Sequence, residues 1–397
     1  PAGLTAAHYL SLKGYKVTVF EADDQPGGML YSAIPSYRLP RETIQKEVQS
    51  LLNENVTLKC STALGRDVTL DSLLDDGFKA VFISIGAHKS LRLQLKGEDL
   101  PGVIPSIQFL KSFNMRGEKL AKGRVGIVGG GNSAVDAARV ALRQPGVTSV
   151  TIFYRRTRGE MPAFEEEVEA AIQEGIKLET LVSPVGILSE RGKLSGVELM
   201  RNELGEIDDS GRRRPVPVPG SQYNVPLDTL IVAISEGSDI DCVSVAGANR
   251  IDVDEKKGTI RVDGETLCTN RPGVFAGGDV VTGPNTVVDA IAAGKRAAVV
   301  IDRYLRNEEL IQPSEIRVPR HFVEPLKTDG TEPPPVTRVE LPRMSVDVRT
   351  RGFAEVELTL SSEDAVREAG RCLRCDLEFT MPKEDSTRVE AAREQLV

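Results

Sequence analysis

The sequence has 397 residues, which is too long for one small domain and suggests roughly two to three. Hydrophobic residues make up 40% and charged residues 27%, ordinary values for a globular protein that exclude global disorder and fibrous architectures. Lys and Arg total 50 against 58 Asp and Glu, and the net charge of −8 argues against a dedicated nucleic-acid binder.

The apolar runs and the cysteines argue against a membrane-spanning or secreted protein. The longest apolar runs, such as residues 230–234 and 297–301, are far too short to cross a bilayer. The five cysteines are scattered, and no stretch has the pattern of a secretory signal, so no disulfide framework is indicated. We therefore expect a protein of the reducing cytoplasm without a membrane span.

The chain opens with what reads as the second half of a βαβ unit. A helix begins at once and is followed by a turn and an apolar strand at 17–20, with Glu21 at its end. The spacing from Gly3 to Glu21 is 21 − 3 = 18, close to the roughly 20 residues expected between a phosphate-loop glycine and an acidic ribose ligand. This favours nucleotide binding over an ordinary βαβ crossover. We expect a strand and the first two loop glycines to precede Pro1, which would make this a truncated chain.

A second unit is complete. The strand at 124–128 runs into a loop of the form G-x-G-x-x-A, an Ala-rich helix and another strand at 149–154. Gly129 permits the tight turn, Gly131 lets the backbone approach a pyrophosphate, and Ala134 allows close packing of helix and strand. Because the strand–turn–helix context is the required one, the motif is specific and predicts a dinucleotide-binding domain.

The residues after the two units differ in charge. The first unit ends in Glu21, whereas the second ends in Arg155 and Arg156, with Arg158 nearby. A carboxylate suits a free ribose 2′-hydroxyl, and guanidinium groups suit a 2′-phosphate. The second unit is therefore predicted to bind NADP. If the arginines only form a solvated basic loop, NAD would fit equally well.

A third signal lies downstream. An apolar strand at 274–276 leads into Gly277, Gly278 and Asp279, and a helix opens near 285–288. Glycines before an aspartate let a ribitol chain lie against the backbone, and the next helix N-terminus can hold partial negative charge on a flavin. The stretch is suggestive of a flavin site, although loops of this composition are common.

Together these residues carry a resemblance to a known family. The motifs are the first unit, GGML at 27–30, IPSYRLP at 34–40, GGGNSAVD at 129–136 and YRRTRGEMPA at 154–163. Over about residues 1–305 the chain resembles the glutamate synthase small-subunit family of flavoproteins, which bind FAD in one domain and NAD(P)H in another. That family includes electron-transfer subunits related to ferredoxin–NADP oxidoreductases and the flavin module of dihydropyrimidine dehydrogenase.

The resemblance implies a set of cofactor-binding residues. The positions that match FAD-binding positions are Gly3, Glu21, Gly28, Leu30, Arg38, Gly278, Asp279 and Thr286. The positions that match NADP-binding positions are Gly129, Gly131, Asn132, Ser133, Arg155 and Arg156. Gly86, where the chain crosses out of the FAD unit, keeps the family's glycine and is expected beside the cofactors.

Departures from the family pattern are also present. The family's Ala-Ile-Gly after the NAD(P) domain reads Ala233-Ile234-Ser235 here, which puts closure around Glu236 and Gly237 in doubt. The family's N-terminal iron–sulfur-binding segment is absent from this sequence.

The expected fold is α/β, with two Rossmann-like domains and an extended proline-rich C-terminal arm. The expected boundaries are 1–117 for the first part of the FAD domain, 118–236 for an inserted NAD(P) domain, 237–308 for the second FAD part, and 309–397 for the arm and tail. Seven prolines fall in 309–350, which predicts an extended arm that wraps a neighbouring subunit. A short helix is expected from 363 to 371.

The cysteines bear on redox chemistry. Cys60, Cys242 and Cys268 are isolated in apolar or strand-like contexts and are expected to be buried and inert. Cys372 and Cys375 form a C-x-x-C, but two thiolates cannot complete a four-ligand cluster. Either a partner or a missing segment supplies the other ligands of a shared iron–sulfur cluster, or the pair is a bystander. The family resemblance tilts towards the shared cluster.

Hydride transfer between a nicotinamide and a flavin needs no side-chain acid or base, so the lack of an obvious catalytic residue fits such an enzyme. We expect an FAD-dependent subunit that exchanges hydride with NAD(P)H and passes electrons to iron–sulfur clusters or a partner subunit. The alternatives are a self-contained disulfide or quinone reductase and a cofactor-loaded structural subunit without turnover. The basic run at 212–214 is expected in a solvent-facing hairpin loop.

Overall fold

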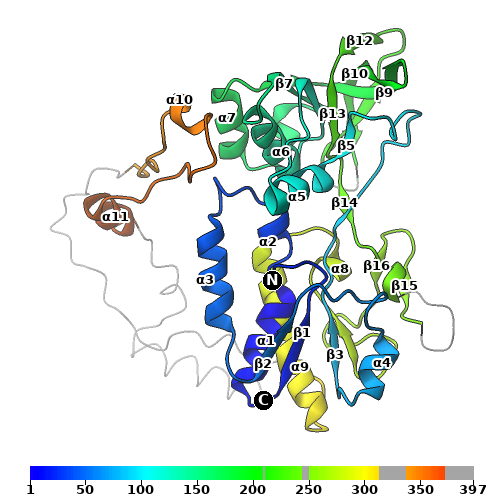
Figure 1. The fold of residues 1–397 in the computed structure, drawn as a ribbon, viewed down its shortest axis with the longest axis vertical. Coiled ribbons are helices and arrows are strands. Elements are labelled where there is room, and N and C mark those ends of the chain that lie inside the picture. The colour runs from blue at the N-terminus through cyan, green and yellow to red at the C-terminus, as the bar shows by residue number, and fades with distance from the viewer. Residues whose placement is uncertain (209–210, 244–249, 313–336, 372–397) are drawn as a thin grey trace, which may run out of the picture. The chain divides into compact units, whose positions relative to one another are not determined.

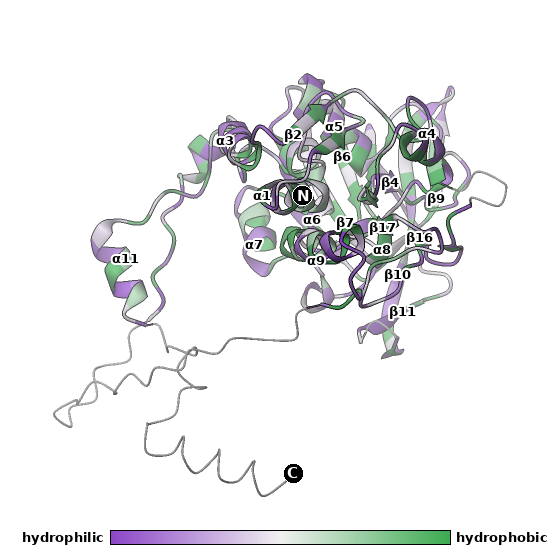
Figure 2. Ribbon diagram, turned by 90° about the horizontal axis from the view of Figure 1, so that it is seen from below, coloured by the Kyte–Doolittle hydropathy of each residue, from purple (hydrophilic) through white to green (hydrophobic). Residues whose placement is uncertain are grey.

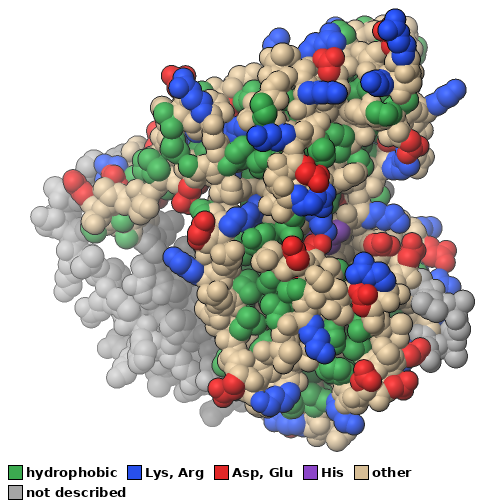
Figure 3. Space-filling model, in the orientation of Figure 1, with side chains coloured by type: hydrophobic (Ala, Val, Ile, Leu, Met, Phe, Trp, Pro, Cys, Tyr) green, Lys and Arg blue, Asp and Glu red, His purple; other side chains and the backbone are tan. Residues whose placement is uncertain are grey.

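The computed structural model describes residues 1–208, 211–243, 250–312 and 337–371 (Figure 1). One compact unit comprises Pro1–Gln312 and Ser345–Val356, and the other described residues belong to a second unit. None of the described helices combines the length and apolar composition needed to cross a membrane. The acidic and basic side chains are scattered over the face that Figure 3 shows.

The first dinucleotide-binding domain is built from segments on both sides of an inserted domain. Its elements are α1 (Ala2–Leu12), β1 (Val17–Phe20), α2 (Met29–Ser32), α3 (Arg41–Leu51), β2 (Val56–Lys59), α4 (Leu70–Asp75), β3 (Val81–Ile83), a 3-10 turn (Asp241–Val243), β15 (Val253–Asp254), β16 (Thr259–Ile260), β17 (Val274–Ala276), α8 (Asp279–Thr282) and α9 (Val287–Leu305). Strand β1 pairs in parallel with β2, and β3 pairs in parallel with β17. Helix α9 runs beside α1 (Figures 1 and 2), so residues nearly 300 positions apart share one core.

The inserted domain contains a five-stranded parallel sheet in the order β5-β13-β6-β7-β8. The sheet and its helices are β5 (Val103–Pro105), α5 (Ser106–Arg116), β6 (Gly123–Val128), α6 (Asn132–Leu142), β7 (Val147–Tyr154), a 3-10 turn (Arg158–Glu160), α7 (Glu165–Gln173), β8 (Lys177–Thr180) and β13 (Thr229–Val232). The chain segment that connects β8 to β13 forms a separate antiparallel sheet of β9 (Val182–Glu190), β10 (Lys193–Ile207), β11 (Arg213–Pro217) and β12 (Tyr223–Pro226). The predicted α/β fold is thus confirmed, with one difference at its edge. Strand β5 belongs to this sheet because β13 pairs with it, so the sheet begins before residue 118.

Small residues let α6 lie close to the sheet. Ala134, Ala137, Ala138 and Ala141 are all buried in the largest hydrophobic cluster, which also holds β6 and β7 side chains. Burial of an apolar helix face is the main source of stability for such a layer. The chain crosses between the two domains through β4 (Lys89–Ser90) and β14 (Glu236–Gly237), which pair with each other.

Part of the expected arm packs on its own chain. Residues 345–356, called the strap below, contain α10 (Val346–Arg349) and belong to the same compact unit as Pro1–Gln312. The backbone N–H of Val356 donates to the carbonyl of Tyr37 at 3.0 Å, and the ring of Phe353 lies 4.5 Å from that of Phe113. These residues of the expected arm therefore pack on their own chain, and the wrapping of a neighbouring subunit stays a prediction. Their aromatic and charged side chains find partners in this chain, which composition alone did not indicate.

The second unit contains the predicted short helix, α11 (Ser362–Ala369). Ser361 caps it by accepting a hydrogen bond from the backbone N–H of Asp364 at 3.0 Å. The proline-rich residues 313–336 and the cysteines Cys372 and Cys375 lie outside the described residues.

Candidate functional site

The start of α1 is where glycine loops of the first domain meet. A Cβ built on Gly28 would lie 3.7 Å from Cδ of Pro1, and one built on Gly278 would lie 3.2 Å from Cβ of Ala2. Both loops therefore reach the helix N-terminus, where the first backbone N–H groups have no partner within the helix. Such an end favours a negatively charged group, and the narrow approach leaves room for backbone rather than side chains. This arrangement fits the pyrophosphate of a dinucleotide.

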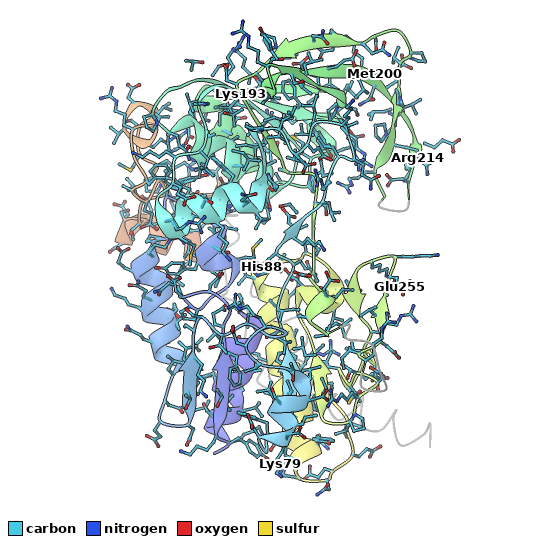
Figure 4. The ribbon with its side chains drawn as sticks, turned by 45° about the vertical axis from the view of Figure 1, so that its right-hand side comes forward. Lys79, His88, Lys193, Met200, Arg214 and Glu255 are labelled. Carbon is cyan, nitrogen blue, oxygen red and sulfur yellow. The ribbon has the colours of Figure 1, made fainter. Side chains whose placement is uncertain are left out.

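Two more predicted glycines, one in the first turn of α1 and one after β3, lie against side chains of residues 84–88. A Cβ on Gly3 would lie 2.6 Å from Oγ of Ser84, and one on Gly86 would lie 3.1 Å from Nε2 of His88. Figure 4 marks His88 close to where the chain crosses between the two domains. Burial, followed by the positive charge of Lys111, lowers the pKa of His88.

Glu21 stands at the end of β1, as the spacing predicted. The half-buried carboxylate accepts a hydrogen bond from the backbone N–H of Asp23 at 2.9 Å, and burial raises its pKa. Lys111 of α5 pairs with Asp23 at 2.5 Å. A carboxylate at this strand end is the acceptor that a ribose hydroxyl needs.

Asp279 and Thr286 occupy the starts of two successive helices. Burial raises the pKa of Asp279, the first residue of α8, to about 6. Thr286 caps α9, because its Oγ1 accepts from the backbone N–H of Asp289 at 3.2 Å. A carboxylate behind a glycine loop and the start of a helix fit the ribityl chain and the flavin edge of FAD.

Arg38 and Leu30, also expected at the FAD site, have protein partners. Nη1 of Arg38 donates to both carboxylate oxygens of Asp136 on α6, at 2.9 and 2.8 Å. Nε of Arg38 lies 3.3 Å from Glu167 on α7. Leu30 packs in a hydrophobic cluster with Leu4. The Arg38 guanidinium thus joins the first domain to the inserted one.

The glycines of the second loop differ in whether the surrounding protein leaves room for a side chain. Gly129 has φ of 145°, and a Cβ there would lie 2.0 Å from the carbonyl oxygen of Ala233, so the fold requires glycine. Gly131 has an ordinary backbone, and the nearest atom to its Cβ would be Cγ of Pro162 at 4.0 Å. Among the described residues, no contact demands glycine at 131. The space in front of α6 is what a pyrophosphate would occupy.

The first residues of α6 have partners that sequence reasoning did not find. Oδ1 of Asn132 accepts from the backbone N–H of Phe164 at 3.1 Å, which holds the loop after β7 against α6. Ser133 forms a side-chain hydrogen bond with Glu236. Burial raises the pKa of Glu236, and the hydrogen bond with Ser133 reduces that rise. Glu236 follows β13 at the carboxyl edge of the sheet, where ligands of such folds bind, so this position was a usable signal.

The two predicted phosphate-binding arginines differ sharply. Arg155 is exposed, whereas the Arg156 side chain is only 2% exposed. Nη2 of Arg156 lies 2.5 Å from Oδ2 of Asp208, and its Nε donates to the carbonyl of Arg213 at 2.7 Å. The side chain of Arg156 is therefore held by the β10–β11 hairpin, whereas that of Arg155 faces outward.

The cysteines of the described part form no disulfide. Cys60, Cys242 and Cys268 are free and partly exposed, which corrects the expectation of full burial. Burial nevertheless raises the pKa of the Cys60 and Cys242 thiols, which lowers their thiolate content and reactivity. Within the described ranges, no cluster of His, Cys, Asp or Glu could hold a metal ion.

Comparisons with known proteins agree with this geometry. Residues 1–294 match the family described as pyridine nucleotide-disulphide oxidoreductase. The NADP(+)-dependent formate dehydrogenase subunit beta of Moorella thermoacetica is 44% identical over 383 residues, which cover 94% of this chain and 53% of that subunit. The glutamate synthase [NADPH] small chain of Escherichia coli (strain K12) is 36% identical over 319 residues, covering 77% of this chain and 67% of that one. The chain thus spans about half the length of the first of these relatives.

A solved structure shares the fold. The structure of Mycobacterium tuberculosis FprA in complex with NADPH superposes with a TM-score of 0.65 at 18% sequence identity. The superposition covers 77% of this chain and 82% of FprA.

Proposed function

Because the chain belongs to the pyridine nucleotide-disulphide oxidoreductase family, we propose that it is an FAD-dependent oxidoreductase subunit that exchanges hydride with NAD(P)H. Electrons then pass to an iron–sulfur or other redox partner in a larger assembly. The observation that carries the proposal is a pair of separate nucleotide loops in one chain. One lies at the start of α1 with Glu21 and Asp279, and the other lies in front of α6 at Gly131.

The chain's residues have binding and orienting roles in this proposal. When bound, FAD and a nicotinamide nucleotide supply the hydride chemistry themselves. Glu21 would accept from the adenosine ribose, Asp279 from the ribityl chain, and the start of α9 at Thr286 would face the flavin. The cysteines of the described part, Cys60, Cys242 and Cys268, are far apart in sequence and form no C-x-x-C, so a self-contained disulfide reductase is less well supported.

We favour NADP over NAD in the inserted domain. The outward-facing Arg155 stands at the end of β7, where the adenosine ribose lies in dinucleotide-binding domains. A guanidinium there would bind a 2′-phosphate through charge-assisted hydrogen bonds. The names of two relatives, an NADP(+)-dependent formate dehydrogenase subunit and a glutamate synthase [NADPH] small chain, support this choice.

The names of the relatives also support a role as a subunit. Both the formate dehydrogenase and glutamate synthase relatives are named as one chain of a larger enzyme. We propose that this chain likewise works in a complex. Cys372 and Cys375, which lie outside the described residues, are proposed as two ligands of an iron–sulfur cluster completed by a partner.

The test is the visible spectrum of the purified complex, followed without oxygen. The flavin released by acid should chromatograph as FAD, and NADPH should bleach the flavin bands faster than NADH. A colourless complex would contradict the flavin assignment. A flavin spectrum that neither nucleotide changes would indicate a cofactor-loaded structural subunit instead.

A further inference from the structure

The segment 233–238 runs from one nucleotide loop to the other. At its start, the backbone N–H of Ala233 donates to the carbonyl of Val128 at 2.8 Å, next to the glycine loop of the inserted domain. At its end, the buried hydroxyl of Ser238 donates to the carbonyl of Asp279 at 3.4 Å, in the glycine loop of the first domain. Strand β14, which Figure 1 labels at the crossing between the domains, lies between these two contacts. The segment therefore connects the two proposed cofactor sites by direct hydrogen bonds.

Glu236, the first residue of β14, carries the charge of this segment. Its backbone pairs with Ser90 of β4, which fixes the point from which its side chain extends. The half-buried carboxylate forms a hydrogen bond with Ser133 in the first turn of α6. Glu236 thus reaches from the crossing strands to the helix start that would bind the pyrophosphate of the nicotinamide nucleotide.

The protein around this carboxylate does not balance its charge. Of the described residues, Ser133 alone forms a hydrogen bond with the Glu236 side chain, and no Lys or Arg of that part forms an ion pair with it. A carboxylate can accept about four hydrogen bonds, and its removal from water is costly unless a cation or several donors face it. The position is therefore suited to a ligand that brings positive charge.

A nicotinamide ring is such a ligand. Hydride exchange requires that the ring lie against the flavin, which is proposed at Asp279 and Thr286. A nucleotide held by its pyrophosphate at the start of α6 reaches that point along 233–238, past Glu236. The nicotinamide ring is positively charged when oxidised and neutral when reduced. A carboxylate beside it therefore stabilises the oxidised form more than the reduced form.

We propose that Glu236 is a specificity-determining residue that favours oxidised over reduced nucleotide by balancing the positive charge of the oxidised nicotinamide ring. Glu236 thereby favours hydride donation to FAD. The C4–H bond of the nucleotide breaks, the hydrogen and its electron pair pass to the flavin, and the ring acquires the charge that Glu236 balances. The inference rests on the proposed function and deepens it, and it holds for NADP and NAD alike because their rings are the same.

The test compares two probes that differ in the charge of the ring, oxidised NADP and tetrahydro-NADP, whose ring is neutral and donates no hydride. Calorimetry on the purified complex at pH 8, far above the ordinary carboxyl pKa of about 4.3, measures both affinities. Glu236→Gln keeps the shape of the side chain and removes its charge. It should weaken oxidised NADP about ten-fold, the loss expected for one nearby charge, and leave tetrahydro-NADP within about two-fold.

Asp239→Asn is the matched control. Asp239 is an exposed carboxylate on the same crossing, so this variant should bind both probes as the unmodified protein does. The flavin absorption spectrum shows that each variant retains its fold and cofactor. Equal weakening of the two probes by Glu236→Gln, or unchanged affinity for oxidised NADP, would overturn the role of Glu236 and leave the proposed function standing. If the unmodified protein binds neither probe, the proposed function fails, and the role of Glu236 fails with it.

Discussion

At the scale of single residues, the glycines of the second loop differ in whether atoms of the protein itself exclude a side chain. The carbonyl of Ala233 leaves no space at Gly129, and the ring of Tyr154 would lie 2.4 Å from a Cβ at Gly130. Those two positions are constrained by the protein itself. At Gly131 the nearest described atom to a Cβ would be Cγ of Pro162 at 4.0 Å, so the described part of the protein leaves room there for a side chain.

Gly131→Ala should therefore separate binding from folding. The variant should unfold at the same urea concentration as the unmodified protein, because its φ of −88° suits alanine and its Cβ meets no close atom. Its affinity for NADPH should fall, since the methyl group occupies the approach of the pyrophosphate. Gly129→Ala is the contrasting variant and should lose stability. Unchanged NADPH binding by Gly131→Ala would argue against the nucleotide site.

Glu174 is a buried carboxylate at the centre of three arginines. Arg139 donates to it at 2.6 Å, Arg143 at 2.7 Å, and Arg349 of the strap lies at 3.1 Å. Burial alone would raise the pKa of Glu174, but the hydrogen bonds from Arg143 and Arg139 outweigh it and hold the pKa below its ordinary value.

Glu174→Gln should destabilise the protein by roughly 3–5 kcal/mol at pH 7, because it leaves buried guanidinium groups without their counter-charge. A lowered folded pKa means that the carboxylate stabilises above its unfolded pKa, about 4.3, and that this stability is lost as the pH falls through the folded value. The difference between the two proteins should thus shrink below about pH 4.3. Urea unfolding at several pH values measures it.

Glu169→Gln, on the helix α7 that ends just before Glu174, is the control for that measurement. Glu169 pairs with Arg158 at 2.8 Å, but both side chains are more than 40% exposed. Exposed ion pairs contribute little to stability, so this variant should unfold like the unmodified protein. An equal loss in both variants would contradict a special role for burial at Glu174.

At the scale of elements, the strap joins parts of the chain that are far apart in sequence. Arg143 of α6 donates to the carbonyls of Arg349 and Gly352 at 3.0 and 3.1 Å. Ser36 of the first domain donates to the carbonyl of Phe353 at 3.2 Å. The strap therefore contacts the first domain and the inserted domain together, next to the Arg38–Asp136 ion pair.

Phe353→Ala should loosen the strap. The ring packs against Phe113 and lies 6.5 Å from the ring of Tyr37, and removal of a partly buried aromatic side chain should cost about 1–3 kcal/mol. Proteolysis of the strap should become faster as local opening becomes easier. Leu358→Ala, at an exposed position just beyond the strap, should change neither quantity. A stable and protease-resistant Phe353→Ala protein would show that the strap is held by its polar contacts alone.

At the scale of the whole molecule, the resemblance to glutamate synthase small chains is confirmed by a relative 36% identical over most of this chain. The fold of two dinucleotide-binding domains is confirmed by the family match and by FprA. The proposed onward path of electrons depends instead on Cys372 and Cys375, beyond the described residues.

Changing Cys372 and Cys375 together to Ser should leave reduction of the flavin by NADPH intact, because that step uses neither thiol. Transfer to the partner should slow and the iron content of the complex should fall, since a cluster loses two ligands. Rapid-mixing spectroscopy and iron analysis measure the two effects. Unchanged iron and unchanged partner reduction would make the pair a bystander without affecting the FAD and NADP assignments.

The sequence by itself determined the features that depend on neighbouring residues. The loop at 129–131 sits between β6 and α6 as predicted, Glu21 follows β1 directly, and the helix after 361 begins at its serine cap. Such features could be predicted because the constraints behind them, glycine backbone freedom, strand and helix periodicity and capping, act within a few residues.

Only the tertiary structure decided which charged side chains pair within the protein and which face outward. Arg155 and Arg156 are adjacent in sequence, yet one faces outward and the other is buried against Asp208. Arg38 pairs with a residue 98 positions away, and Arg349 of the strap reaches Glu174. A charge can be buried only when its counter-charge is brought to it, and that counter-charge comes from a distant element whose position the local sequence does not encode.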